Sequence, residues 1–508
     1  MPPNKVATLY ALLERNAGSF PDRTAVEFRG ERVSYAGLLD RVNALAGGLA
    51  ALGLKKGDPV CVLAQNHPAY LELFGAASLL GLVLHPLNWR LTTEELGLIV
   101  QRAAPRMMIV DEAALEKVAG WPKEHPAIEH WFQWEAASGD GFSSWEELFA
   151  PQGSSPPVAE KAGREEPFMV IATAAVDVVP RGAMLSQSNL LAANRFLVSG
   201  LDLKAGDVNL VTLPLFHIAA LSAALAFFQA GGCNLVMSRF DAGEAAALIP
   251  AGGVTHFVSF PPVLGQVLDL AAEGGHDLSG LRMVIGLEGP ETVERLEKHT
   301  GAEFFTGFGQ SETSGFITLG GYRERPGSAG RPGPETELRL EDDYGREVPA
   351  GEPGEICVKG AMVFSGYHTL PEVTAHTFRG GWHHTGDVGR LDQDGYLYYV
   401  KRKPEKELIK PGGENVYPAE VEAVIMELEQ VSAVCVFGVP DSKWGEAVRA
   451  VVEVTDGARL TLTGEAVIGH VAGRIARYKK PQEVFITDRL PRDDSGSVNR
   501  EAVREKWG

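Results

Sequence analysis

One short segment combines glycines, an aromatic ring and a carboxylate in an order suited to a nucleotide. In FFTGFGQSETSG (304–315) a strand pattern ends in glycine, so the backbone can approach a flat ligand closely. Phe308 can stack on an adenine, and Glu312 can supply a hard oxygen ligand for Mg²⁺ held by nucleotide phosphates. A strand-to-helix loop with a solvated Glu312 is the competing interpretation of this segment taken alone.

Further along the chain, IKPGGENVYPAEVE (409–422) carries two adjacent glycines, Gly412 and Gly413, which let the backbone approach a ligand. Pro418 then begins a helix, as proline does at a first helical turn. Just before this segment, residues 380–402 contain a Thr-Gly-Asp turn and end in a basic residue. A purely structural turn is the alternative there, because Asp and Gly dominate turns in general.

Two other places carry residues with chemical potential. PLFHIAA (214–220) puts His217 at the end of an apolar strand pattern, where a satisfied core histidine is the commoner outcome. ARYKKP (476–481) belongs to a basic cluster that could meet anionic phosphates, although such a helix end is often only a solvated basic face. The members of that cluster are Arg474, Arg477, Lys479 and Lys480.

The elements that must position these residues follow an α/β pattern. From residue 50 to about 310, short apolar runs alternate with longer amphipathic segments such as 290–300, which favours largely parallel sheets. The runs expected to be buried strands are VCVLA (60–64), MMIV (107–110), VNLVTLP (208–214), CNLVM (233–237), THFVSF (255–260) and LRMVIGL (281–287).

The composition and the expected secondary structure of the chain change twice after that region. Between about 325 and 400, Gly and Pro are frequent and short strands lie between turns, which indicates a small β-rich subdomain. After the charged stretch KRKPEKE (401–407), a helix over 418–429, two strands and a helix ending near Tyr478 are expected. We therefore predict an N-terminal domain over 1–401, a hinge over 402–407 and a C-terminal domain over 408–508. The fold class is α/β plus α+β.

The composition limits the class of protein. With 508 residues, the chain is too long for a single core. A formal net charge of -19 disfavours a general nucleic-acid binder, so an anionic ligand needs a local basic pocket. Four scattered cysteines without a CxxC pair argue against a disulfide framework or zinc site and favour the cytoplasm. No signal peptide and no membrane span are expected, because the apolar stretch 218–228 is too short.

Taken in order along nearly the whole chain, these segments resemble the acyl-adenylate-forming ligase superfamily, which includes acyl-CoA synthetases, luciferases and adenylation domains. The residues Phe308 to Glu312 stand in the places of a Tyr-Gly-x-Thr-Glu motif. The segment 380–402 matches Trp-x-x-Thr-Gly-Asp followed by Asp-Gly-Tyr and a basic residue, and it is the most specific match. The stretch 409–422 resembles the glycine loop that opens the small C-terminal domain, which is mobile in this superfamily.

The resemblance implies ATP, Mg²⁺ and coenzyme A as ligands, and it implies a role for each matched residue. Residues expected to bind the nucleotide, its phosphates or CoA are Thr173, Arg181, Gly182, Gly289, Phe308, Gly309, Asp387, Arg402, Gly412, Gly413, Trp444 and Lys479. Residues expected at the catalytic positions are His217, Ser311, Glu312, Arg402 and Ser497, with Glu312 as the metal ligand.

Four departures from the superfamily pattern are present. The glycine-rich phosphate loop is replaced by TAAVDVVPRG (173–182), which resembles the loop of feruloyl-type aromatic-acid ligases and gains Asp177. Ser497 stands where an adenylation lysine is usual, and loss of one such charge lowers the rate by roughly 10²–10³. The hinge is two residues longer than usual. Glu288 replaces a small residue in the turn expected to bind adenine.

The leading interpretation is a fatty- or aryl-CoA ligase that forms acyl-AMP and transfers the acyl group to CoA. One alternative is a catalytically weak nucleotide- or acyl-binding protein on the same fold, favoured by the altered phosphate loop and Ser497. Another is acyl transfer to a carrier-protein thiol. The sequence does not identify the acid, and a homodimer is only the default expectation.

Overall fold

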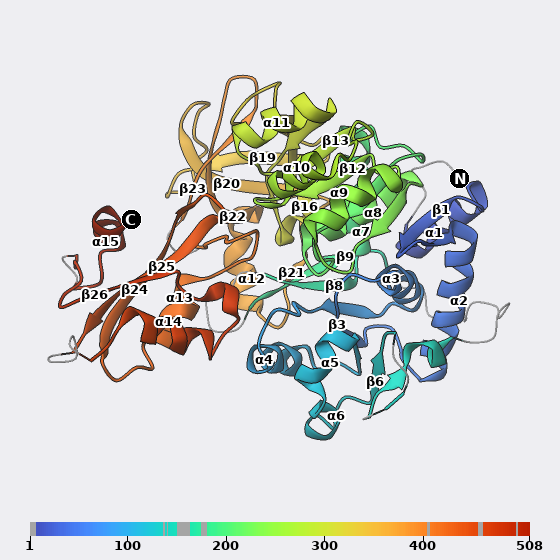
Figure 1. Ribbon diagram of the computed structural model, residues 1–508, viewed down its shortest axis with the longest axis horizontal. Coiled ribbons are helices and arrows are strands. Elements are labelled where there is room, and N and C mark those ends of the chain that lie inside the picture. The colour runs from blue at the N-terminus through green and yellow to red at the C-terminus, as the bar shows by residue number, and fades with distance from the viewer. Residues whose placement is uncertain are drawn as a thin grey trace.

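The computed structural model describes residues 7–135, 138–139, 141–149, 163–173, 180–403, 407–455, 461–493 and 496–508. Figure 1 shows a large body formed by the N-terminal and central parts of the chain, with the C-terminal part, in orange to red, beside it at one end of the long axis. We call residues 407–508 the small domain and the rest the large domain. The exact domain limits stay a prediction, and residues 404–406 of the expected hinge lie outside the described residues.

A nine-stranded sheet forms one layer of the large domain, in the order β18-β17-β14-β13-β12-β10-β11-β1-β2. Its six central strands, from β14 to β1, are parallel, as the buried apolar runs predicted. The bounds are β1 Thr24–Phe28, β2 Glu31–Ser34, β10 Val208–Val211, β11 Cys233–Val236, β12 His256–Ser259, β13 Met283–Gly286, β14 Glu303–Thr306, β17 Thr318–Gly321 and β18 Arg331–Pro332.

An eight-stranded sheet forms a second layer, in the order β21-β9-β8-β4-β3-β5-β6-β7. It is parallel except where β9 pairs antiparallel with β8 and β21. The bounds are β3 Pro59–Leu63, β4 Val83–Pro86, β5 Met107–Val110, β6 His130–Gln133, β7 Ser143–Ser144, β8 Pro167–Ala172, β9 Gly182–Ser186 and β21 Gly366–Tyr367.

Helices cover these sheets and separate them (Figure 1). Two of them, α7 and α8, pack on each other, and α8 is buried along most of its length, so the apolar stretch expected to be a buried helix is one. The bounds are α1 Leu9–Ser19, α2 Tyr35–Ala51, α3 Ala69–Leu80, α4 Thr93–Ala103, α5 Glu112–Val118, α6 Trp121–Glu124, α7 Gln187–Gly200, α8 Ile218–Ala230, α9 Ala242–Ala251, α10 Val263–Gly274, α11 Pro290–Thr300 and α12 Pro371–Thr377.

The expected β-rich subdomain is an antiparallel sheet, β19-β20-β22-β23, that follows the large parallel layers. A separate two-stranded ribbon, β15 and β16, follows β14 along the chain. The bounds are β15 Gly309–Gln310, β16 Gly315–Phe316, β19 Thr336–Glu341, β20 Pro353–Gly360, β22 His383–Leu391 and β23 Leu397–Arg402.

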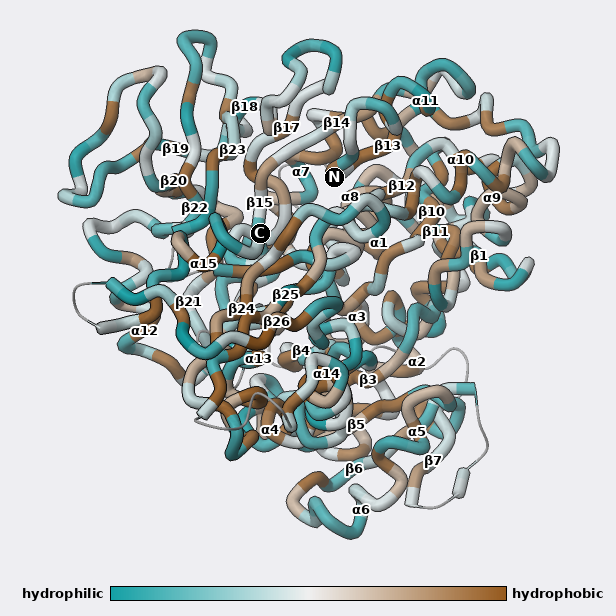
Figure 2. Tube along the Cα trace, turned by 60° about the vertical axis from the view of Figure 1, so that its left-hand side comes forward, coloured by the Kyte–Doolittle hydropathy of each residue, from teal (hydrophilic) through white to brown (hydrophobic). Residues whose placement is uncertain are grey.

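The small domain is a three-stranded sheet, β24-β25-β26, with its own apolar core. Figure 2 shows hydrophobic residues along these strands and hydrophilic residues in the loops that project from the molecule. The bounds are β24 Val431–Asp441, β25 Gly445–Val454, β26 Glu483–Thr487, α13 Pro418–Ile425, α14 Gly464–Ala472 and α15 Arg500–Trp507. These layers confirm the predicted fold class.

Two helix ends of the small domain differ from the prediction. Helix α13 ends at Ile425 rather than Glu429, because Met426 is 46% exposed and the chain then turns into β24. Helix α14 ends at Ala472, and a separate 3₁₀ turn over Arg477–Lys479 follows it. In both helices the apolar face that packs on the core ends before the run of helix-forming residues ends. Because packing of that face stabilises the helix, the helix stops where burial stops.

Gly286 closes β13 at the point where the predicted adenine turn begins. Its φ is +149°, and a Cβ there would lie 1.8 Å from the backbone oxygen of Ser259 on β12. We therefore predict that Gly286→Ala lowers the free energy of unfolding by about 3 kcal/mol, because neither strand can move away freely. Gly289→Ala is the matched control: nothing lies within 4 Å of its Cβ position, so it should change stability by less than about 1 kcal/mol. Equal urea midpoints for the two variants would contradict this account.

Candidate active site

The predicted phosphate side of the site lies where β9 of the eight-stranded sheet meets the 3₁₀ turn over Ser311–Thr313. Glu312 lies in a 3₁₀ turn with Ser311, only 5% exposed, and its Oε1 accepts a hydrogen bond from the hydroxyl of Tyr367, at 2.7 Å. The guanidinium of Arg181 stacks over the Tyr367 ring, 5.5 Å from its centre. Tyr367 therefore links a basic residue of the phosphate loop to the predicted metal ligand, a role that sequence reasoning missed.

The described ends of the phosphate loop are held together by their backbone. The amide of Thr173 donates to the carbonyl of Arg181, at 2.7 Å, and Arg102 donates to the carbonyl of Pro180, at 3.0 Å. Gly182 has a packing reason to be glycine, because a Cβ would lie 2.5 Å from Val170. Residues 174–179, including Asp177, lie outside the described residues.

Phe308 and Gly309, both predicted to bind the nucleotide, have local structural roles in this structure. Phe308 is 8% exposed and packs in an apolar cluster with Ile317 and Leu340, so its predicted stacking on adenine stays a prediction. Gly309 belongs to the ribbon β15–β16, where a Cβ would lie 2.2 Å from the carbonyl oxygen of Gly315. The close approach that requires glycine is therefore, in this structure, an approach of backbone to backbone.

The predicted ribose side lies on the β-rich sheet. Asp387 on β22 is paired across the sheet with Arg402 on β23, and Asp387 Oδ1 lies 3.4 Å from Arg402 Nε. A second basic residue, Lys410, comes close to this pair from the loop before the glycines. Burial, together with Arg402, lowers the pKa of Lys410 to about 8 against the opposing effect of Asp387 and Glu446. Sequence reasoning did not single out Lys410, although it lies in the glycine loop, two residues before Gly412.

The glycine loop of the small domain faces the large domain. Gly412 has a φ of +59°, and its amide donates to the carbonyl of Trp444, at 2.9 Å. Gly413 has a φ of +84°, and its Cβ position lies 3.7 Å from Phe260, which follows β12. Both glycines are thus required by left-handed backbone, and they form a turn that packs between Trp444 and Phe260.

Glu414, the next residue of that loop, is the strongest polar contact between the domains at this point. It accepts from Arg90 at 2.7 Å and from Asn88 at 3.1 Å, and both its oxygens lie 3.3 Å from Nε2 of His217. Burial acts to raise the pKa of Glu414, but His217 and Arg90 outweigh it, so the pKa lies below its usual range. His217 is therefore not a satisfied core residue, because it pairs with a residue of the other domain.

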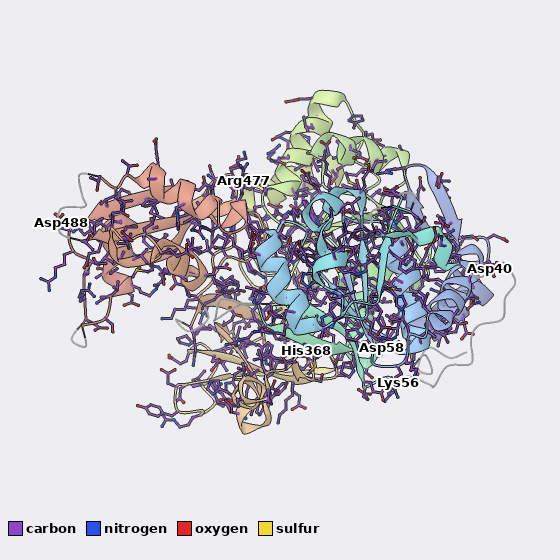
Figure 3. The ribbon with its side chains drawn as sticks, turned by 90° about the horizontal axis from the view of Figure 1, so that it is seen from below. Asp40, Lys56, Asp58, His368, Arg477 and Asp488 are labelled. Atoms are coloured by element: carbon purple, nitrogen blue, oxygen red, sulfur yellow. The ribbon has the colours of Figure 1, made fainter. Side chains whose placement is uncertain are left out.

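Ser497 lies elsewhere on the small domain, exposed, with its amide donating to Asp493 at 3.1 Å. Figure 3 labels Asp488, just after β26, at the outer end of the small domain, while Arg477 lies where the two domains meet. Arg500, the nearest basic candidate to replace the missing lysine, instead binds Glu407 at 2.8 Å and Glu422 at 2.6 Å. The structure therefore brings the glycine loop, and not the Ser497 segment, to the large domain.

The chain matches the family model described as AMP-binding enzyme over residues 13–368 and the model of the AMP-binding enzyme C-terminal domain over 420–497. The chain belongs to the AMP-binding enzyme family. It is 35% identical to a feruloyl-CoA synthase of Amycolatopsis sp over 500 residues, 97% of this chain and 98% of that protein. It is 30% identical to a long-chain-fatty-acid–CoA ligase of Mycobacterium tuberculosis over 484 residues, 94% of this chain and 93% of that one.

Two solved states of one relative, the o-succinylbenzoate CoA synthetase of Bacillus subtilis, differ in their likeness to this AMP-binding enzyme. A double mutant bound to a CoA product analogue superposes with a TM-score of 0.84 at 27% identity, covering 97% of this chain and 98% of that chain. The complex with the acyl-adenylate intermediate gives a TM-score of 0.69 at the same identity, covering 97% of both chains.

Lys479 has a different setting from the one predicted. Its ammonium lies 2.6 Å from Glu95 Oε1 on α4 and 2.7 Å from Glu420 Oε2 on α13, and its side chain is 4% exposed. Of the neighbouring basic residues, Arg477 is exposed and Lys480 is partly buried. The predicted contact of Lys479 with CoA is thus replaced in this arrangement by a buried ion pair between the domains.

We predict that Lys479→Met lowers the free energy of unfolding by about 3–5 kcal/mol, because it leaves Glu95 and Glu420 buried without their cation. Lys480→Met, one residue away and partly exposed, should cost less than about 1 kcal/mol. Denaturant unfolding monitored by tryptophan fluorescence measures both. Unchanged stability of Lys479→Met, with a raised KM for CoA, would restore the CoA-binding interpretation.

Glu288 gives the predicted adenine turn a titratable group. Its Oε1 accepts a hydrogen bond from Ser259 Oγ at 2.7 Å, but burial outweighs this bond and raises its pKa to about 7. The folded state therefore binds more protons than the unfolded state between about pH 4.5 and 7, so Glu288 weakens the fold as pH rises through that window.

We predict that Glu288→Gln removes this pH dependence. The change that it causes in the free energy of unfolding should be about 2 kcal/mol more favourable at pH 8 than at pH 4.5. The amide keeps the size of the side chain and an acceptor for Ser259. The exposed Glu291→Gln is the matched control. Parallel stability curves for wild type and Glu288→Gln from pH 4.5 to 8 would refute the assignment.

Proposed function

We propose that this AMP-binding enzyme is an AMP-forming acyl-CoA ligase. A carboxylate attacks the α-phosphate of ATP, giving acyl-AMP and pyrophosphate. The sulfur of CoA then attacks the acyl carbon, the C–O bond to the phosphate breaks, and AMP leaves with its electron pair. The thiol proton is released, so the products of the second step are acyl-CoA, AMP and a proton.

The observation that carries this proposal is the docking of the glycine loop on the large domain. Gly413 packs on Phe260, and Glu414 binds His217, so a loop of the small domain closes over the edge of the large sheets. The higher likeness to the relative's CoA-product-analogue state than to its acyl-adenylate state supports an arrangement suited to thioester formation. Trp444, which packs on Gly412 and is 39% exposed, is available to a pantetheine arm at this position.

Nucleotide binding is assigned to two groups of residues, one on the β-rich sheet and one at the ends of the phosphate loop. Asp387 and Arg402 are proposed to hold the ribose and the adjacent phosphate, and Thr173 and Arg181 to hold phosphates. The donor set fits a metal-bound polyphosphate, because Glu312 is a nearly buried carboxylate and, within the described part of the chain, Thr173 Oγ1 and Arg181 Nε lack hydrogen-bond partners. Mg²⁺ held by Glu312 would neutralise charge on the pyrophosphate leaving group.

The acid is proposed to have a hydrocarbon or aromatic body, because two relatives of the chain are named a feruloyl-CoA synthase and a long-chain-fatty-acid–CoA ligase. An apolar gap of about 10 Å³ lies between α7, α8 and the ends of β12, β13 and β16, and it holds no more than about one water molecule as it stands. Apolar side chains line it throughout, so it would favour an apolar substrate body over a charged one only if these elements moved apart. Its lining includes Leu197, Leu203, Phe227, Val258, Ile285 and Phe316.

The test is AMP release from MgATP with a panel of fatty and aromatic acids, with and without CoA. Acid-dependent AMP and a matching acyl-CoA mass in the CoA reactions are the expected result. AMP release without acyl-CoA, but with acyl transfer to a carrier-protein thiol, would favour that alternative. Binding of ATP or acid without turnover, in wild type and in the variant below, would favour a binding protein on this fold.

We predict that Ser497→Lys raises the rate of acid-dependent ATP–pyrophosphate exchange by roughly 10²–10³, because it restores a cation that can bridge carboxylate and α-phosphate during adenylation. The step from acyl-AMP to acyl-CoA should be unchanged, since Ser497 lies away from the docked glycine loop. Ser497→Ala controls for loss of the hydroxyl. Equal exchange rates in all three proteins would show that adenylation here does not depend on position 497.

A further inference from the structure

Four buried hydrogen-bonding groups without a protein partner lie in the segments proposed to bind the nucleotide or CoA: the phosphate loop, residues 304–315 and the glycine loop. Among the described residues, Thr173 Oγ1, Arg181 Nε, Gln310 Nε2 and the hydroxyl of Tyr417 have no hydrogen-bond partner. All four can donate a hydrogen bond. An unsatisfied buried polar group destabilises a fold by about 1–3 kcal/mol, so such a set indicates a ligand rich in acceptors, as a phosphate is.

Three of the four donors belong to the large domain, but Tyr417 is carried by the small domain. It is 7% exposed and directly precedes α13, which begins at Pro418. Burial is the main reason that the pKa of Tyr417 lies well above its usual value. Glu312 and Glu420 raise this pKa further, while Arg402 and Arg181 act to lower it. Glu312, Arg402 and Arg181 are thus its charged neighbours, and the hydroxyl stays protonated at physiological pH.

A continuous chain of polar contacts fixes Tyr417 when the domains are docked. Glu95 of the large domain binds the ammonium of Lys479 at 2.6 Å, and Lys479 binds Glu420 Oε2 at 2.7 Å. The other oxygen of Glu420 accepts the backbone amide of Tyr417, at 3.0 Å. The same ion pair that holds the small domain therefore also holds the backbone of Tyr417, so the position of its hydroxyl depends on this arrangement of the domains.

We propose that the Tyr417 hydroxyl donates a hydrogen bond to the phosphate of the acyl-adenylate during transfer of the acyl group to CoA. As the C–S bond forms and the C–O bond to phosphorus breaks, negative charge grows on the departing AMP, and a donor aimed at it stabilises the transition state. Tyr417 is thus a catalytic residue of the second half-reaction only. This inference rests on the proposed ligase function.

The decisive experiment supplies the intermediate and follows a single turnover. Wild type and Tyr417→Phe are mixed with synthetic acyl-AMP, made from an acid that the wild type accepts, and with CoA. The variant should form acyl-CoA roughly 10²-fold more slowly, while its acid-dependent ATP–pyrophosphate exchange stays at the wild-type rate. It should also bind AMP more weakly in calorimetric titration.

Two controls separate this role from a structural one. Tyr344→Phe removes the hydroxyl of a tyrosine that is 84% exposed and should change neither half-reaction. Because the Tyr417 hydroxyl has no partner among the described residues, Tyr417→Phe should leave the melting temperature unchanged or raise it, whereas loss of a structural hydrogen bond would lower it.

The two proposals fail in different ways. Wild-type protein that cannot convert any acyl-AMP and CoA to acyl-CoA would overturn the ligase function. The role of Tyr417 alone would be overturned if the wild type makes acyl-CoA and Tyr417→Phe either matches the wild-type rate of acyl-CoA formation or is slowed by the same factor in both half-reactions.

Discussion

The docked arrangement of the two domains is held by buried ion pairs between them, and the one at Lys479 joins three charges. The ammonium of Lys479 lies between two carboxylates that belong to different domains, Glu95 on α4 and Glu420 on α13. Three charges removed from water are costly unless each is closely paired, so the contact is stable only when the small domain sits in one orientation. Glu95 also closes the capping box of α4 with Thr92, which fixes the position of its carboxylate in advance.

The orientation set by this ion pair decides which face of the small domain meets the nucleotide site. It places the glycine loop, Glu414 and Tyr417 against the large domain and leaves Ser497 exposed. The contacts of Arg500 with Glu407 and Glu422 keep that residue within the small domain. In the arrangement described, position 497 therefore lies exposed and away from the docked glycine loop.

The basic side chains around the proposed nucleotide site are opposite in sign to the net charge of the molecule. The chain has a net charge of -19, yet Arg181, Arg402 and Lys410 gather with neutral donors around the proposed nucleotide site. In a site shielded from water these local groups act more strongly than the distant surface charge, which solvent and salt screen. A strongly acidic protein can therefore bind an anionic nucleotide through a few preorganised donors.

The sequence by itself determined the fold class, most strands of the large sheets and the family motifs, because hydrophobic periodicity, glycines at left-handed positions and ordered motifs are local signals. It identified Glu312, Asp387, Arg402 and the two loop glycines as residues worth locating. Only the tertiary structure decided that Lys479 forms an interdomain ion pair, that Tyr367 binds Glu312, and that the hydroxyl of Tyr417 is buried without a partner among the described residues. Glu95 and Lys479 are 384 residues apart, and no local pattern records such a contact, because it exists only when two separately folded surfaces meet.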